Sequence, residues 1–405
     1  MKPLFNREFD KKLFFLWIIL MMVGLVAVYS ASTLKIEDGY VRSDLYLRQL
    51  IFVILSFITM FIVLKIPTTI MEIFIYPGYI LTLVLLVVVF FMPPVNNAYR
   101  WISIGGFSIQ PSEMAKIVLV LSCAKIMCKA NISKLHMLLK SFVFLIIPFI
   151  LVLRQPDLGT ALVLIVMYVV MLAQAGFPLL ILFILMTPII SMITSFFIPA
   201  FIVFALLLIF LLYKSKFSLP LISFIIVINL FFLFITPLLW NSLRPYQQNR
   251  ILTFIDPTRD PLNTGYQVIQ ARIAVGSGQL LGKGFLEGTQ KNMNFLPEQH
   301  TDFIFSVLAE EFGFIGSVAL LLVFLFFFMR IVKNIYRSEI KERQIAMAGI
   351  FGYLFFQVSI NIAMNIGLMP TTGITLPFIS YGGSSLLVNS FAVALVLKYS
   401  QEKDV

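Results

Sequence analysis

Two aspartates stand where predicted apolar helices begin, and carboxylates in such places can carry out chemistry at a membrane surface. Asp302 lies where a long polar loop enters the helix expected at 303–330, and Asp157 opens the helix expected at 158–175. A positioned carboxylate can act as a general base. Asp is also a preferred residue at helix starts, where it caps free backbone amides, and Thr301 is a further candidate cap. The pattern alone leaves catalysis and capping open for both aspartates.

A charged pair, Glu113 and Lys116, lies in a neighbouring outer segment. The two residues are three apart, so they share one face of the helix expected at 113–128. One interpretation is a local ion pair that secures the helix start. The other is a cation that binds the phosphate of an anionic lipid head group. Arg100 and Trp101 in the same segment favour the second interpretation, because Arg, Lys and Trp suit phosphate binding at a membrane interface.

Two further acidic residues, Glu310 and Glu311, lie about 12 Å beyond Asp302 at the rise of an α-helix. Ionisable side chains at membrane depth are costly unless they are paired. We therefore expect at least one of them to face the bundle interior and to find a partner, and we interpret both as structural.

Several familiar kinds of site are excluded. The two histidines, His136 and His300, fall on opposite sides of the membrane, which excludes a histidine-rich zinc site and an H-E-x-x-H protease. The chain has no G-x-S-x-G motif, which disfavours a serine hydrolase. Gly282, Lys283 and Gly284 superficially resemble a phosphate loop, but no Ser or Thr follows the lysine, so we expect turns there.

The composition predicts the elements that must position these residues. Hydrophobic residues make up 60% of the chain and charged residues only 12%, whereas a soluble domain has about 45–50% and about 25%. Apolar stretches long enough to cross a bilayer recur from end to end. We predict an all-α, polytopic transmembrane helix bundle of about 10–12 spans, forming a single domain over residues 1–405. Helices are expected near 13–33, 46–64, 70–92, 113–128, 139–153, 158–175, 177–196, 200–213, 219–239, 303–330, 345–368 and 384–398.

The net charge of +11 does not indicate a nucleic-acid partner, because the basic residues are spread over short segments between apolar runs. This is the pattern of the positive-inside rule, and it predicts that both termini are cytoplasmic. The cytoplasmic segments then hold Lys2, Arg7, Lys11, Lys12, Lys65, Lys129, Lys134, Lys140, Lys214, Lys216, Arg330, Lys333, Arg337, Lys341, Arg343, Lys398 and Lys403.

Residues 240–302 form a long polar loop on the outer side, and a loop of this length is usually functional. Within it, Tyr266, Ile269 and Ile273 recur at helical spacing. We interpret this stretch as an amphipathic helix at the membrane interface. The alternative is a helix that packs on the bundle.

Four stretches resemble the shape, elongation, division and sporulation (SEDS) proteins of bacteria. They are RWISIGGFSIQPSEMAK (100–116), RQPDLGTAL (154–162), FLPEQHTDFIFSVLAEEFG (295–313) and PFISYGGSS (377–385). They occur in the family's order, and the resemblance covers nearly the whole chain. Residues 256–290 resemble the elongation member of the family more than the division member. The family usually has one helix where three are predicted within 177–239.

The resemblance implies a peptidoglycan glycosyltransferase that polymerises lipid II at the outer face of the bacterial cytoplasmic membrane during cell elongation. It implies a class B penicillin-binding protein as the partner that cross-links the glycan, together with other membrane proteins of the elongation complex. The family's essential aspartate falls on Asp302. The resemblance places substrate-binding residues at Arg100, Trp101, Gln110, Glu113, Lys116 and Asp157.

The implied reaction inverts a sugar centre once, which calls for a single displacement with Asp302 as general base. The pyrophosphate leaving group calls for cations, for which Lys116 and Arg100 are the candidates. A Mg²⁺ or Mn²⁺ ion is a further candidate, with Asp302 as a possible metal ligand, and no nucleotide is required. The alternatives are a flippase for the lipid-linked precursor, a non-enzymatic scaffold, and a division-type polymerase.

Overall fold

The computed structural model of the chain describes residues 9–36, 39–94, 99–104, 107–129, 133–215, 217–243, 245–256, 264–292 and 298–401. Lys2, Arg7, Lys216 and Lys403, which the charge pattern assigned to cytoplasmic segments, lie outside the described residues.

Helices dominate the described residues, and two short antiparallel hairpins, β1–β2 and β3–β4, accompany them. In chain order the elements are α1 (Lys11–Ala31), β1 (Thr33–Ile36), β2 (Gly39–Arg42), α2 (Leu45–Lys65), α3 (Thr68–Ile73), α4 (Ile75–Val88), η1 (Val89–Phe91), β3 (Ile102–Ile104), β4 (Phe107–Ile109), α5 (Pro111–Met127), α6 (Lys134–Arg154), α7 (Leu158–Ala175), α8 (Leu179–Thr194), α9 (Ile198–Lys214), α10 (Leu219–Ser242), α11 (Pro245–Ile255), α12 (Thr264–Ser277), α13 (Thr289–Asn292), α14 (Ile304–Arg337), α15 (Lys341–Asn365) and α16 (Gly383–Tyr399).

The predicted spans coincide with helices, which confirms the all-α polytopic bundle. Among the described residues, seven helices are long and apolar enough to cross a membrane, namely α1, α2, α6, α7, α10, α14 and α15. Shorter apolar helices lie at Ile75–Phe91, α8, α9 and α16. Many large apolar side chains on these helices are exposed, as Phe91 and Phe234 illustrate. Lipid covers such side chains in a bilayer, so the chain is a multi-pass membrane protein.

The chain divides into two compact units. The larger comprises Met1–Ala175 and Leu252–Val405, and the smaller comprises Gly176–Ile251. The smaller unit contains α8, α9 and α10, the three helices predicted where the SEDS family usually has one. The prediction of a single membrane domain remains a prediction.

In the smaller unit, one buried asparagine joins two apolar helices. Asn229 on α10 donates to Thr187 Oγ1 at 3.0 Å and accepts from Ser191 Oγ at 2.6 Å, and both partners lie on α8. A polar group in an apolar bundle must find such partners. The hydrogen bonds therefore fix the register of α8 and α10.

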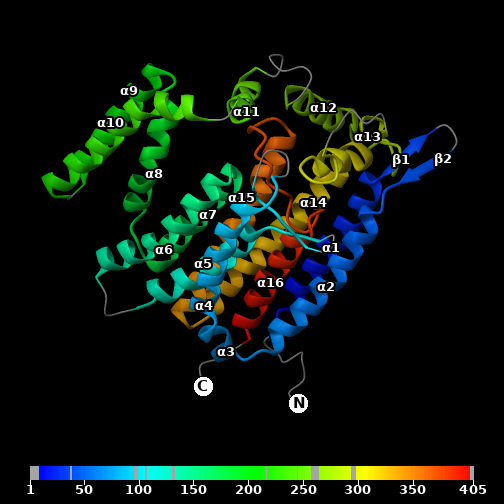
Figure 1. Cartoon of the computed structure of the whole chain (residues 1–405), viewed down its shortest axis with the longest axis horizontal. Helices are drawn as coiled ribbons and strands as arrows, with labels where there is room; N and C mark the ends of the chain where they lie inside the picture. The colour runs from blue at the N-terminus through cyan, green and yellow to red at the C-terminus, as the bar shows by residue number, and fades with distance from the viewer. Residues whose placement is uncertain are drawn as a thin grey trace. The chain divides into compact units, whose positions relative to one another are not determined.

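In the larger unit, α14 packs against α1, α12 and α15, while α15 also packs against α5 and α7. The helix α16 packs against α2. The short helices α12 and α13 and the β1–β2 hairpin lie at one end of this bundle, and α3 lies at the opposite end (Figure 1). The long polar loop thus contributes structure at the end away from α3.

The helices α1 and α14 run antiparallel and are joined by polar contacts at both ends. At one end, the Asp10 carboxylate caps α1 by accepting from Leu13 N at 3.1 Å, and it pairs with Arg330 at 2.7 Å. At the other end, Ser30 Oγ donates to both carboxylate oxygens of Glu311, at 2.6 and 2.7 Å. Both acidic side chains are buried, so each requires its partners.

The helix α14 is broken at Gly313, whose φ of 67° lies in the left-handed region that favours glycine. The break leaves backbone groups without partners inside the helix. Residues 279–284 supply the partners: Lys283 N and Gly284 N donate to the carbonyls of Glu310 and Glu311, at 2.9 and 3.1 Å. In return, Phe314 N and Ile315 N donate to the carbonyls of residues 279 and 280, at 2.8 and 3.1 Å. The long polar loop is thereby joined to the broken helix by backbone hydrogen bonds.

The helix predicted within the loop is α12, and it packs on the bundle, as in the alternative interpretation. Val268, Ala271 and Ala274 are buried, whereas Ile273 is exposed. The buried residues are small and spaced three apart, and α12 packs against α14 and α15. The face that contacts the bundle is therefore not the predicted face that includes Ile273. A position at the membrane interface remains a prediction.

Candidate active site

The segment 371–385, which leads into α16, contacts the turn that carries Asp302. Ser380 Oγ donates to the carbonyl of Thr301 at 2.6 Å, and Tyr381 N donates to the carbonyl of His300 at 2.8 Å. These contacts fix the backbone on the N-terminal side of Asp302 from two residues that follow it by 78 and 79 positions in the sequence.

The same segment contacts the other two motifs. Ser384 Oγ donates to the carbonyl of Ser108 at 2.9 Å and accepts from Gln110 N at 3.2 Å. At the start of α7, Gly159 lies so close to Thr372 that a Cβ atom there would stand 2.9 Å from its carbonyl oxygen. Glycine is therefore required at position 159. The four motifs that the sequence singled out thus meet around one segment.

Asp302 lies in a turn just before α14 and is half-buried. Its amide donates to the carbonyl of Glu298 at 3.1 Å. Its carbonyl accepts from the side-chain amides of Asn361 and Asn365 on α15, at 3.0 Å each. The backbone of Asp302 is therefore held from both sides, which fixes the point from which its carboxylate extends.

Capping of α14 is carried out by another helix. The N-cap position is Phe303, so Thr301 is not the cap, and that prediction was wrong. Asn365 Oδ1 accepts from Ser306 N at 3.0 Å and from Ser306 Oγ at 2.6 Å. Ser306 N, a first-turn amide of α14, also donates to the carbonyl of Phe303 at 3.1 Å. A chemical role for Asp302 remains a prediction.

The second aspartate, Asp157, lies at the centre of a polar cluster. It accepts from Thr160 N and Oγ1, at 3.3 and 2.9 Å, and so caps α7. It also accepts from Gln110 Nε2 at 3.2 Å and lies 3.8 Å from Arg100 Nη1, and Arg100 donates to the carbonyl of Pro156. Asp157 therefore positions two of the predicted substrate-binding residues. A direct contact between Asp157 and substrate remains a prediction.

The pair on α5 is a buried ion pair. Lys116 Nζ lies 2.8 Å from Glu113 Oε2, and Lys116 is fully buried. Its ammonium also lies 5.1 Å from the centroid of the Tyr353 ring, within the range of a cation–π interaction. The structure shows the local ion pair, and a contact of Lys116 with a phosphate remains a prediction. Trp101, next to β3, is half-buried.

One titratable side chain, His300, lies in the turn beside Asp302. Burial lowers the pKa of His300 below its ordinary value, against the opposing effect of the Glu298 carboxylate. Its ring packs edge-on against Tyr381, with centroids 5.8 Å apart. A neutral imidazole is therefore the form that the folded turn favours.

Within the described part of the chain, no group of three or more His, Cys, Asp or Glu side chains could hold a metal ion. Magnesium is often bound through one or two carboxylates, with substrate phosphates and water completing its shell. The described residues therefore fit a divalent ion only if the substrate supplies ligands, and Asp302 remains the candidate protein ligand.

The residues that position Asp302 were not among the predicted site residues. Asn361 and Asn365 lie four residues apart on α15, so both face the same direction. Polar side chains at such spacing in an apolar helix are expensive and mark a built site. That signal was available from the sequence, whereas the contacts of Ser380 and Ser384 were not, because they join segments far apart in the chain.

The sequence matches the FtsW, RodA and SpoVE cell cycle protein family over residues 10–201 and 197–405. The chain belongs to this family. One relative is a probable peptidoglycan glycosyltransferase FtsW of Wigglesworthia glossinidia brevipalpis, 35% identical over 96% of this chain and 93% of its own length. Another is the peptidoglycan glycosyltransferase RodA of Treponema pallidum, 32% identical over 96% of this chain and 97% of its own length.

Solved structures of the family share this fold. A peptidoglycan synthase complex, described as coordinating polymerization and crosslinking, contains a chain that is 27% identical, with a TM-score of 0.72 and coverage of 97% of both chains. The rod shape determining protein RodA of Thermus thermophilus has a TM-score of 0.65 over 98% of both chains, at 24% identity. These comparisons confirm the predicted family and its fold.

Proposed function

We propose that this chain is a peptidoglycan glycosyltransferase that polymerises lipid II into glycan strands with Asp302 as its catalytic carboxylate. Relatives named RodA and FtsW both carry this enzyme name. The observation that carries the proposal is the arrangement around Asp302, whose backbone is held by Asn361 and Asn365 while Asn365 also caps α14. A carboxylate that extends from a backbone held at a fixed point is suited to proton transfer.

In the proposed reaction, the 4-hydroxyl oxygen of an acceptor sugar attacks C1 of the reducing-end sugar of the donor. The bond from C1 to the pyrophosphate oxygen breaks, and the hydroxyl proton passes to the Asp302 carboxylate. The leaving group is undecaprenyl pyrophosphate. A single displacement of this kind inverts the sugar centre and needs one general base.

The leaving group develops negative charge, which Arg100 and Lys116 are the candidates to stabilise. Each already has a carboxylate partner, Asp157 and Glu113 respectively. Binding of pyrophosphate would have to compete with these partners or share the cation with them. A Mg²⁺ or Mn²⁺ ion held by Asp302 and the substrate would supply additional positive charge at the same place.

We place the site on the outer face of the bacterial cytoplasmic membrane, with both termini in the cytoplasm. The positive-inside pattern of the sequence supports this orientation. We further propose a class B penicillin-binding protein as partner and a role in cell elongation. The solved peptidoglycan synthase complex supports such a partner, and the likeness of residues 256–290 to the elongation member supports the role.

The decisive experiment incubates the purified protein with lipid II in detergent or vesicles and resolves the products on a gel. Long glycan strands are the expected result. Transfer of lipid II between leaflets without polymer would instead support a flippase, and neither activity would leave a scaffold. A division-type enzyme would also make glycan strands. To distinguish a role in elongation from a role in division, the protein is depleted in cells and the cell shape is inspected.

A further inference from the structure

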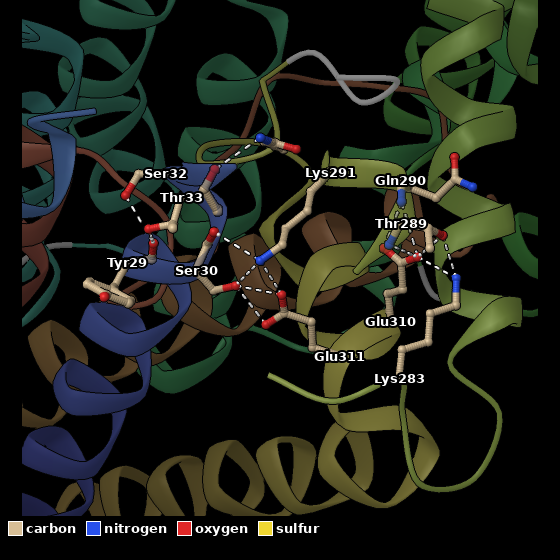
Figure 2. A network of polar contacts seen from close by, with 12 residues as sticks. Tyr29, Ser30, Ser32, Thr33, Lys283, Thr289, Gln290, Lys291, Glu310 and Glu311 are labelled. Atoms are coloured by element: carbon tan, nitrogen blue, oxygen red, sulfur yellow. Dashed lines mark hydrogen bonds and ion pairs between the residues drawn. The ribbon is translucent and has the colours of Figure 1, made fainter. Parts of the chain in front are cut away.

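The outer loop carries a fully buried lysine that the proposed mechanism does not use. Lys291, on α13, forms an ion pair with Glu311 of α14, and neither side chain is exposed. Its ammonium also donates to Ser30 Oγ at 2.6 Å and to the carbonyl of Ser30 at 3.2 Å. Figure 2 shows Lys291, Ser30 and Glu311 pointing toward one another. Three segments, α1, α13 and α14, therefore meet at one buried charge.

A second loop residue, Gln299, reaches the next residue of α1. Its side-chain amide donates to the carbonyl of Ala31 at 3.0 Å. The last two residues of α1, Ser30 and Ala31, are thus the anchors for Lys291 and Gln299. Asp302 follows Gln299 by three residues. The loop is therefore attached to α1 at Lys291 and again at Gln299, just before the turn that carries Asp302.

The end of α1 suits these contacts physically. The last carbonyls of a helix lack partners within the helix and carry partial negative charge, so a cation and an amide are favourable there. A buried lysine is costly unless it is paired and hydrogen-bonded, and Glu311 and Ser30 meet that need. A buried pair of this kind can specify one arrangement of neighbouring segments over others.

We propose that Lys291 is a positioning residue for the reaction: held by Glu311, it anchors the outer loop to the end of α1 and, together with Gln299, sets the place of Asp302. The proposal rests on the proposed function for Asp302. Lys291 acts through its contacts with Ser30 and Glu311 and not on the substrate.

The neighbouring ion pair provides a matched control. Lys283 lies 2.7 Å from Glu310 Oε1, and its side chain is 26% exposed. Glu310 also accepts from Thr289 N and Oγ1, both at 2.9 Å, and so keeps donors when Lys283 is removed. The Lys283 ammonium donates to Thr289 Oγ1 within the loop and to Glu310 Oε1 on α14, both at 2.7 Å, so a change there leaves the anchor on α1 in place.

The test compares Lys291→Met with Lys283→Met in the full-length protein. Because Lys291→Met leaves Glu311 buried without its cation, the neutral pair Lys291→Met/Glu311→Gln is made as well. Two quantities are measured: amide hydrogen exchange of residues 298–303 without lipid II, and kcat and KM for polymerisation. For both Lys291 variants we expect faster exchange in 298–303 and a fall in kcat of about 10- to 100-fold, since small misplacements of a catalytic group cost this much.

We expect KM to change little and Lys283→Met to behave as the unmodified protein in both measurements. The proposal is overturned if the neutral pair leaves exchange unchanged, or if exchange rises while kcat stays the same. It is also overturned if Lys283→Met has the same effect as the neutral pair. Failure of the unmodified protein to polymerise lipid II would refute the proposed function instead, and the exchange measurements would still test the anchor.

Discussion

The side-chain amide of Asn365 donates to the backbone carbonyl of Asp302 at 3.0 Å, across 63 positions of sequence. The other end of the same amide group accepts from Ser306 N and Oγ. One residue of α15 therefore performs two tasks. It caps α14 from outside, and it holds the backbone of the residue immediately before the N-cap. Because neither task uses the Asp302 side chain, that side chain can be changed without removing either contact.

The first prediction follows for Asp302→Asn. The substitution removes the negative charge but keeps the size of the side chain and the backbone contacts to Asn361 and Asn365. We expect polymerisation to fall by about 10²–10⁴-fold, the usual contribution of a general base. The thermal midpoint in detergent should change little. Gel analysis of lipid II products and thermal unfolding check the two expectations.

Asp302→Glu separates a base from a metal ligand, since it keeps the carboxylate and moves it by one methylene. Restoration of its activity by excess Mn²⁺ would favour metal ligation. An Asp302→Asn variant with full activity would remove this residue from the mechanism altogether.

The second prediction concerns Asn365→Ala. The change removes the side-chain acceptor of Ser306 N and Oγ and one of the two donors to the Asp302 carbonyl, and the loss of such buried hydrogen bonds costs about 1–3 kcal/mol. We expect a lower thermal midpoint together with reduced kcat. The matched control is Asn229→Ala in the smaller unit, which also removes a buried interhelical amide. That variant should lose stability and keep kcat. Equal losses of kcat in the two variants would mean that Asn365 acts only through global stability.

The third prediction concerns the pair Lys116 and Glu113. Lys116→Met alone leaves the buried Glu113 carboxylate unpaired, and breaking a buried pair in this way costs about 3–5 kcal/mol. The double variant Lys116→Met/Glu113→Gln removes both charges and should fold. If the ammonium stabilises the pyrophosphate, the folded double variant should still lose about 10²-fold or more in kcat. Activity near that of the unmodified protein would make the pair purely structural.

The fourth prediction is a pH dependence located at His300. Because burial lowers the pKa of His300 in the folded turn, the unfolded form binds a proton at higher pH than the folded form does. Above about pH 6.5, the ordinary histidine value, both forms are neutral and this residue has no effect. As the pH falls below that value, the turn should become less stable. The protection of Tyr381 N, which donates to the His300 carbonyl, should then fall, measured as its hydrogen-exchange rate relative to the intrinsic rate at each pH. His300→Gln should remove this loss of protection between pH 7 and pH 5.

The fifth prediction tests the orientation. Leu281 and Glu339 are both exposed and lie on opposite sides of the membrane in the proposed topology. The native Cys123 and Cys128 are free and are first replaced by alanine. A cysteine at position 281 should then react with an impermeant thiol reagent in intact cells, and one at 339 should react only after lysis. The reverse pattern would place the site in the cytoplasm.

The sequence predicted the helices well because a bilayer requires long apolar stretches of the helices that cross it, and seven of the described helices meet that requirement. It also predicted that Glu310 or Glu311 would find a partner, and both are paired with lysines of the loop. The partners themselves could not be predicted. Their choice depends on how residues 279–291 fold back onto α14, which is a contact between segments that local patterns do not encode.

The face of α12 that packs on the bundle could not be predicted from the sequence either. Large apolar residues at helical spacing, such as Ile273, indicated one apolar face, but the helix contacts the bundle through Ala271 and Ala274. Small residues allow two helices to approach closely and contribute little to a hydrophobicity pattern. The break at Gly313 was missed for a similar reason, since a single glycine in an apolar run is often tolerated within a helix.

The polar contacts at the two ends of the α1–α14 pair are separated by 20 residues of α1, from Asp10 to Ser30, or about 30 Å of helix. This length matches the hydrocarbon thickness of a typical bilayer. A helix pair fastened at both ends cannot adjust to a thinner membrane by sliding one helix along the other, and tilting as one body is a response that keeps both sets of contacts. The end of α1 that anchors Lys291 and Gln299 would tilt with it. The geometry of the long polar loop is therefore expected to respond to membrane thickness, and hence to lipid chain length.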